Sequence, residues 1–235
     1  MPLDRSCSKI LVMARAVLAG LLCVSAAAAA QPDITGNWEL RFDSRSVPDA
    51  ALTPAAAQAM GKHRRKDLEG MRWCRFIGMP QQMDGPLDIR QSEREIVVDT
   101  PMHAIARHFY IDGRKHIAAE DFEATTVGNS VAHWEGEVLV VDTVGLSTQG
   151  LVSIPGGGFR TATSHLVERY RLLPGGDMLA VQSTWTDPTV FRRPHSYEYH
   201  YYRSLPGTNA REWPCEPNDA ERARFFAPVL PPKAK

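Results

Sequence analysis

The sequence predicts an all-β protein: a lipocalin-like, antiparallel up-and-down barrel with a short helical excursion after the first strand. Short strand-like segments follow one another along most of the chain, and glycine-containing turn signals separate several of them. A meander of this kind is expected to close, because closure removes its exposed edges. The expected strands are residues 34–42, 86–91, 94–100, 103–111, 127–134, 137–143, 161–173, 178–186 and 195–203.

The first expected strand is half-buried, because Trp38, Leu40 and Phe42 alternate with polar residues. Residues 50–71 follow it and are rich in alanine, which indicates a helix or an irregular excursion. No internal repeat and no linker divides the rest of the chain, so we expect one barrel domain.

Residues 1–30 have the layout of a secretory signal peptide. Three basic residues come first, residues 16–24 form an apolar run, and the small residues that follow end in an A-x-A motif. We therefore expect export to the periplasm and a mature barrel domain over residues 31–220. The proline-rich tail, residues 221–235, is expected to be loose.

The composition excludes some classes of function. The 235 residues include 27 basic and 27 acidic side chains, and loss of the first 30 residues leaves a formal charge of −2. This balance argues against a nucleic-acid-binding surface. The basic cluster at residues 62–66 is followed at once by Asp67, which indicates a solvated helix face. Beyond the N-terminal segment no apolar run reaches the roughly 20 residues of a membrane-spanning helix. The oligomeric state stays open.

The cysteines point to one disulfide bond. Cys7 and Cys23 lie in the expected signal peptide, so the exported chain keeps only Cys74 and Cys215. In an oxidising compartment a bond between these two is the simplest expectation. The chain-entropy model gives so long a loop roughly 4–5 kcal/mol of stabilisation.

The expected hairpins place two charged side chains on inward faces. Turns at 92–93 and 101–102 put Arg107 in the middle of an apolar row. A turn at 174–177 pairs Glu168 with Ser183, again among apolar neighbours. The row around Arg107 consists of Leu87, Ile89, Ile96, Val98, Ile105, Phe109 and Ile111.

Two interpretations of Arg107 and Glu168 stay open at this stage. They form a structural ion pair, which is what buried charges usually do, or they serve a ligand. In the second case Arg107 receives an anionic head group, and Glu168, desolvated among aromatic residues, acts as a general acid or base. Aromatic residues on the inner faces either fill the core or line a pocket for a small ring-bearing molecule. The candidate ligand-binding residues are Trp38, Phe109, Tyr170, Trp185 and Tyr199.

No cofactor or metal is expected. The histidines lack H-x-H and H-E-x-x-H spacing, and neither remaining cysteine lies in a C-x-x-C motif. No phosphate-cradling loop, dinucleotide fingerprint or nucleophile elbow occurs. The Gly156–Gly158 run precedes no helix and is expected to be a mobile lid or a spacer.

Several motifs resemble a family of exported, lipocalin-like bacterial proteins without a well-assigned function. They are the G-x-W of residues 36–38, Cys74 with residues 78–80, residues 110–114 and 128–130, the stretch 134–145, and His165 with residues 167–170 and 187–188. The most specific of them is the W-E-G-E-V-L-V-V-D-T run at 134–143. The resemblance covers roughly residues 34–218 and implies a barrel fold and an exported protein. This chain has Asn129 where the family pattern usually has histidine, and Ala162 where it usually has aspartate. If those positions react in relatives, their chemistry is in doubt here.

Three functions follow as hypotheses. The first is a periplasmic barrel that binds a small apolar or aromatic molecule, such as a carboxylate or a phenol. The second is a cofactor-free lyase or isomerase on such a molecule, with Glu168 as proton shuttle and Arg107 steadying negative charge. The third is a structural envelope protein with a solid core. A ligand cavity separates the third from the first two, and turnover separates the second from the first.

Overall fold

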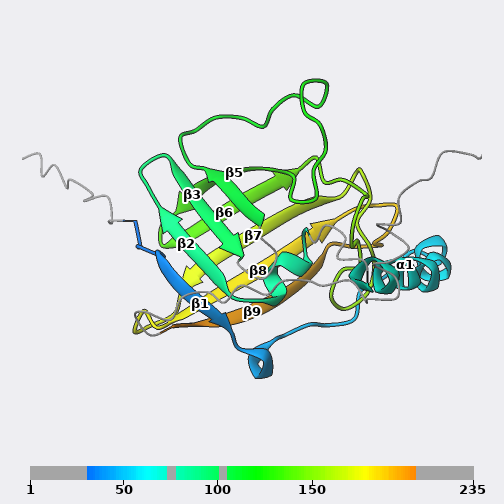
Figure 1. Ribbon diagram of the computed structural model, residues 1–235, viewed down its shortest axis with the longest axis horizontal. Helices are drawn as coiled ribbons and strands as arrows, with labels where there is room; N and C mark the ends of the chain where they lie inside the picture. Colours follow the sequence, from blue (N-terminus) through cyan, green and yellow to red (C-terminus); the bar gives the residue numbers. More distant parts are fainter. Residues whose placement is uncertain (1–30, 73–77, 101–104, 205–235) are drawn as a thin grey trace, which may run out of the picture.

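The computed structural model describes residues 31–72, 78–100 and 105–204, and its strands form one closed nine-stranded barrel (Figure 1). The all-β barrel prediction is confirmed. The expected signal peptide, both cysteines of the expected disulfide and the tail lie outside the described residues. The strands are β1 Gly36–Leu40, β2 Leu87–Gln91, β3 Glu95–Thr100, β4 Ile105–Tyr110, β5 Asn129–Glu135, β6 Val138–Val144, β7 His165–Leu172, β8 Met178–Thr186 and β9 His195–Arg203.

One pair of neighbouring strands departs from the expected antiparallel order. β4 and β5 are parallel and pair through only two residue pairs, Phe109 with Ser130 and Tyr110 with Val131. The reason is parity: a closed barrel with an odd number of strands cannot have every neighbour antiparallel. Residues 111–128 carry the chain back to the end where β4 began, so the parallel pair falls here, and β1 and β9 close the barrel as antiparallel neighbours.

The hairpin registers agree with the predicted inward faces. The β7–β8 register is as predicted, with Glu168 opposite Ser183. In β2–β3 and β3–β4 the registers differ from the prediction by two residues, so that Arg107 lies opposite Val98. Side chains alternate with a period of two, so this shift leaves Arg107 on the inner face.

The barrel interior is filled largely by aromatic side chains. Trp38, Phe109, Tyr170 and Trp185 are fully buried. A short 3-10 helix, η2 (Gln81–Asp84), contacts this interior, because the carbonyl of its residue Met83 accepts a 2.6 Å hydrogen bond from the Tyr201 hydroxyl. The core therefore combines the inner faces of the strands with residues from connecting segments, among them Met79, Met83 and Phe191.

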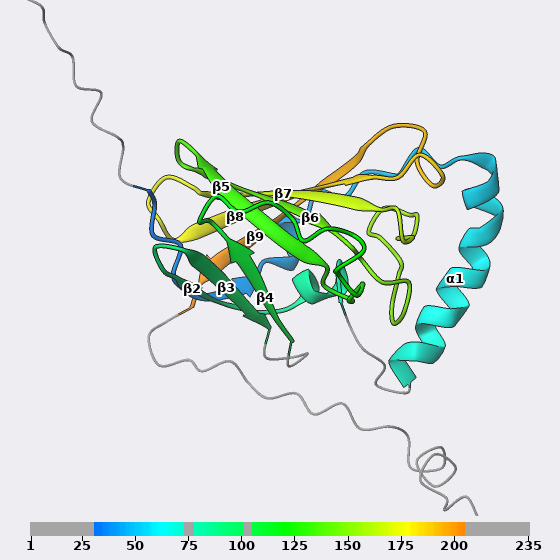
Figure 2. The same cartoon turned by 90° about the horizontal axis from the view of Figure 1, so that it is seen from above.

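The helical excursion is α1, Pro54–Arg72, which lies beside the barrel (Figure 2). The residues of its basic cluster are largely exposed, as expected, but Asp67 is buried. Its carboxylate accepts backbone N–H bonds from Val152 at 3.0 Å and Ser153 at 2.7 Å. Asp67 thus fixes the helix to a loop, which corrects its interpretation as part of a solvated face. In the described part of the chain no helix is long and apolar enough to cross a membrane.

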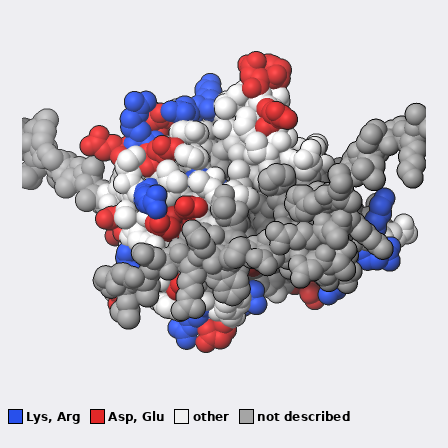
Figure 3. Space-filling view, in the orientation of Figure 1, with Lys and Arg blue, Asp and Glu red and all other residues white. Residues whose placement is uncertain are grey.

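The Gly156–Gly158 run packs against neighbouring segments, as expected of a spacer. Gly156 has φ +78°, and a Cβ there would lie 2.1 Å from the Pro48 carbonyl oxygen. The Gly156 carbonyl accepts a hydrogen bond from the Ala50 N–H at 2.8 Å. Basic and acidic side chains are interspersed over the described part of the face in Figure 3.

Candidate functional site

Arg107 and Glu168 form a bidentate ion pair inside the barrel. Arg107 Nη1 donates to Glu168 Oε1 at 3.1 Å, and Nη2 donates to Oε2. The side chains are 1% and 0% exposed. Sequence reasoning therefore brought together the right two residues, and the structure adds that each is the other's main partner.

A chain of hydroxyl groups extends this pair across the barrel. Arg107 Nη2 also donates to Thr143 Oγ1 at 3.2 Å, and that oxygen lies 2.8 Å from Ser130 Oγ. The Tyr170 hydroxyl donates to Glu168 Oε1 at 3.2 Å. Burial alone would lower the pKa of Arg107, but the Glu168 carboxylate outweighs burial and raises it. The Arg107 guanidinium is thus held in its charged form.

The network spans four strands around the weak parallel pair. Arg107 lies on β4, Ser130 on β5, Thr143 on β6 and Glu168 on β7. These strands follow one another around the barrel. Side-chain bonds therefore tie β4 to its neighbours where the backbone ladder has only two residue pairs. We call the line between β4 and β5 the seam.

The predicted aromatic residues lie together in the core. Phe109 packs against Tyr170 with ring centroids 5.6 Å apart, and the Arg107 guanidinium lies 4.7 Å from the Phe109 centroid. The Tyr199 hydroxyl donates to Asp84 at 2.9 Å. Burial, followed by the Asp84 charge, raises the pKa of Tyr199, and burial raises the pKa of Asp84 itself. In the described residues these rings contact each other or the protein's own polar groups, as core residues do.

A pocket of about 180 Å³ lies at the seam. Its walls come from β4, from the connection 111–128 and from the start of β5, so it lies where β4 residues 106–108 have no residue pair with β5. Apolar groups and a few polar ones share its lining, as in most small-molecule sites. The lining residues are Ala106, Arg107, His108, Tyr110, Ile117, Phe122, Val127, Gly128, Asn129 and Ser130.

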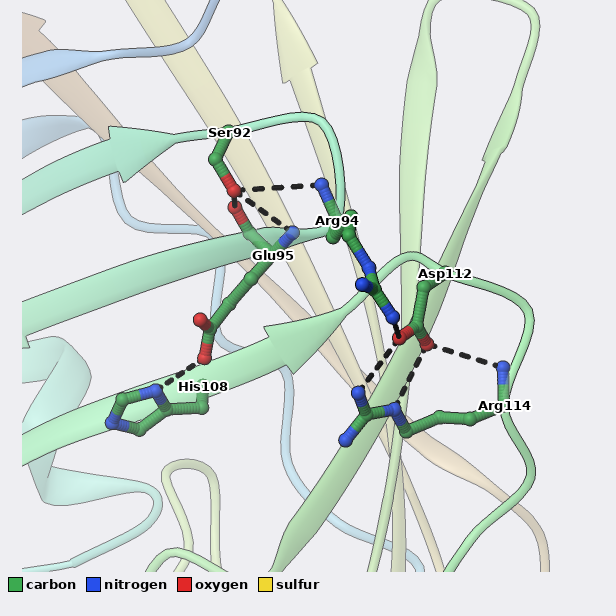
Figure 4. Close-up of polar contacts among 6 residues, drawn as sticks. All are labelled: Ser92, Arg94, Glu95, His108, Asp112 and Arg114. Atoms are coloured by element: carbon green, nitrogen blue, oxygen red, sulfur yellow. Dashed lines mark hydrogen bonds and ion pairs between the residues drawn. The ribbon is translucent and has the colours of Figure 1, made fainter.

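Polar contacts fix the connection that covers this pocket. At its start the Asp112 carboxylate accepts bonds from Arg94 at 3.2 Å and from Arg114 at 2.7 Å and 2.9 Å, and the three side chains converge in Figure 4. Arg114 also lies over the ring of Tyr110, at 3.9 Å. Figure 4 further shows His108, a lining residue, bonded to Glu95 on the neighbouring strand. These contacts therefore fix both the connection 111–128 and the β4 side of the pocket wall.

Next to the pocket lies a cluster that sequence reasoning did not assemble. His116 Nδ1 bonds to Asn129 Oδ1 at 2.9 Å, and His116 Nε2 bonds to Asp142 Oδ1 at 2.8 Å. His165 Nε2 lies 2.9 Å from both Asp142 oxygens. Motif spacing gave no signal because His116 comes from an irregular connection. In the sequence, Asn129 is distinguished by its departure from the resembled pattern.

Both ring nitrogens of His116 lie within hydrogen-bonding distance of side-chain oxygens, Asn129 Oδ1 on one side and Asp142 Oδ1 on the other. Within residues 31–72, 78–100 and 105–204, no group of three or more histidine, cysteine or carboxylate side chains is arranged to hold a metal ion.

In comparisons with known proteins, no family model matches the chain, and no curated protein sequence matches it significantly.

Proposed function

We propose that this protein binds a small aromatic or apolar molecule in the pocket at the seam. The observation that carries the proposal is the pocket itself, which combines apolar walls from Ile117, Phe122 and Val127 with the polar groups of Asn129 and His108. The interior aromatic residues serve as packing around the Arg107–Glu168 pair. The binding site therefore differs from the inner cavity that the sequence suggested.

The size of the pocket favours a molecule with one ring. An engineered cavity of about 150 Å³ accepts benzene, and the pocket here has about 180 Å³. The polar groups in its wall favour a ring that carries an oxygen, such as a phenol or a carboxylate. Larger lipids exceed this volume.

The two other hypotheses have less support. A lyase or isomerase that uses Glu168 requires a carboxylate free to exchange protons, but Arg107 and Tyr170 occupy the Glu168 oxygens. A purely structural protein requires no pocket. Product detection during the binding assay tests the enzymatic hypothesis directly.

The binding test is calorimetry with phenol, benzoate, acetophenone and ethylbenzene. Ala106→Trp places an indole in the pocket from an exposed strand position, and we expect it to weaken binding about tenfold or more. The control Gln182→Trp puts the same side chain on the exposed face of β8, and affinity should stay within about twofold. The proposal fails if none of the four molecules binds, or if Ala106→Trp binds them as the wild type does.

Export to the periplasm, with a Cys74–Cys215 disulfide in the mature chain, belongs to the same proposal. The layout of residues 1–30 supports it. N-terminal sequencing of the periplasmic fraction should find Gln31 first, and a thiol assay on the denatured, unreduced protein should find no free thiol. An uncleaved chain, or two free thiols, contradicts this part of the proposal.

A further inference from the structure

The amide of Asn129 has one side fixed and the other facing the pocket. Its Oδ1 accepts from the backbone N–H of Ile117 at 3.2 Å and bonds to His116 Nδ1. A backbone N–H is always a donor, so the oxygen must be on this side. The Nδ2 group is then on the opposite side. In the described part of the chain no residue accepts a hydrogen bond from it, and it is not among the fully buried polar atoms without a partner, so it is accessible at the pocket that Asn129 lines.

An amide donor at the pocket wall without an acceptor from the described part of the protein can donate to an oxygen of a bound ligand. Building on the proposed function, we propose that Asn129 is the specificity-determining residue of the pocket: its Nδ2 donates to a carbonyl, ether or carboxylate oxygen on the ring-bearing ligand. Arg107 does not have this role, since its terminal nitrogens face Glu168 and Thr143 inside the barrel.

His116 and Asp142 position this donor. His116 bridges Asn129 Oδ1 and the Asp142 carboxylate, and His165 holds that carboxylate from the other side. The row runs from β6 and β7 to the pocket edge and prevents the amide from rotating. Because a rotated amide would present its oxygen to the ligand, the row determines whether the pocket donates or accepts a hydrogen bond.

Asn129→Asp tests the inference with almost no change in shape. One carboxylate oxygen still accepts from Ile117 and His116, while the other replaces the Nδ2 donor with an acceptor. The probes are acetophenone, which only accepts hydrogen bonds, and ethylbenzene, which has a similar shape and no polar group. We expect the variant to bind acetophenone about tenfold or more weakly and ethylbenzene within about twofold of the wild type.

A second variant, Asn129→Leu, removes both polar groups and should lose the preference for acetophenone over ethylbenzene. The thermal midpoint of each variant is measured so that unfolding is not mistaken for lost affinity. If Asn129→Asp binds acetophenone as the wild type does, the inference is wrong and the proposed function stands. If the wild type binds neither probe, nor phenol or benzoate, the proposed function itself fails.

Discussion

Arg107 on β4 and Glu168 on β7 form a buried ion pair across two intervening strands, so the pair joins parts of the barrel that no backbone ladder joins. The position of this ion pair beside the seam indicates a structural role. Where β4 and β5 share two residue pairs, this pair and the Thr143 and Ser130 hydroxyls supply further bonds.

Removal of either member should destabilise the protein strongly. Glu168→Leu leaves the Arg107 charge buried without a counter-charge, and Arg107→Met does the same to Glu168, so each should cost about 3–5 kcal/mol of unfolding free energy. The double variant should recover much of that loss, because it leaves no unpaired charge. Urea denaturation of the four proteins measures the coupling. Additive losses in the double variant would show that the two side chains do not act as a pair.

Arg160 should be a second position of high cost. It is 1% exposed, and it donates to the carbonyl oxygens of Met79 at 2.8 Å, Thr126 at 2.7 Å and Gln149 at 2.6 Å. Burial lowers its pKa to about 10. Arg160→Met leaves three carbonyl groups without this donor and should cost about 3 kcal/mol or more.

Hydrogen exchange distinguishes this effect from a general loss of stability. Relative to the wild type, Arg160→Met should increase the exchange rates of amides near Thr126 and Gln149 more than those of amides in β7 and β8. The control Arg169→Met removes an exposed pair with Glu135 at 2.8 Å, and it should cost no more than about 1 kcal/mol. Equal costs for the two variants would contradict the role given to Arg160.

Asp187 should make stability depend on pH at acid values. Burial opposes ionisation of this carboxyl group, but hydrogen bonds from Thr161, Thr189 and Ser164 outweigh it and lower its pKa. A lowered pKa means that this stabilisation is fully present above the usual value of 3.8 and is lost as the pH falls below it.

Asp187→Asn tests this dependence. At pH 6 the variant should be about 2–3 kcal/mol less stable, because one amide N–H₂ then faces hydroxyl donors. The difference from the wild type should shrink in urea titrations at progressively lower pH, below the usual carboxyl range. A difference that stays constant with pH would show that Asp187 contributes through its shape alone.

Gly156 and Gly136 make a matched pair of glycines with positive φ. Gly136 has φ +60° and open space around it, so Gly136→Ala adds only backbone strain. Gly156→Ala adds a similar strain and a clash with the Pro48 carbonyl oxygen, and should cost about 1–3 kcal/mol more. Thermal unfolding of both variants measures the difference. Equal midpoints would mean that the loop around Gly156 is free to move.

The alternation of apolar and polar residues predicted those features of the fold that follow from the two-residue period of a strand. It identified nine strands, the inward side chains of Arg107 and Glu168, and the β7–β8 register. The β3–β4 register was wrong by two residues because the connection between those strands is longer than the assumed turn. The parallel seam was missed, although a count of nine already requires one such pair in a closed barrel.

The seam pocket depends on contacts of a connecting segment, which the alternating pattern of strands does not predict. His116 and Phe122 come from the connection 111–128, which has no periodic pattern. The sequence therefore predicted the walls of the barrel but not the segment that lies against them. That segment supplies the partner of Asn129 and four of the ten residues that line the pocket.

Because β1 and β9 are antiparallel neighbours, the barrel is a circular permutation of a simple meander. Joining the end of β9 to the start of β1 and opening the chain within residues 111–128 gives the order β5, β6, β7, β8, β9, β1, β2, β3, β4. In that order every consecutive pair of strands is adjacent and antiparallel. The two new chain ends would flank the seam, so the natural connectivity is what places a covered pocket there instead of a pair of free ends.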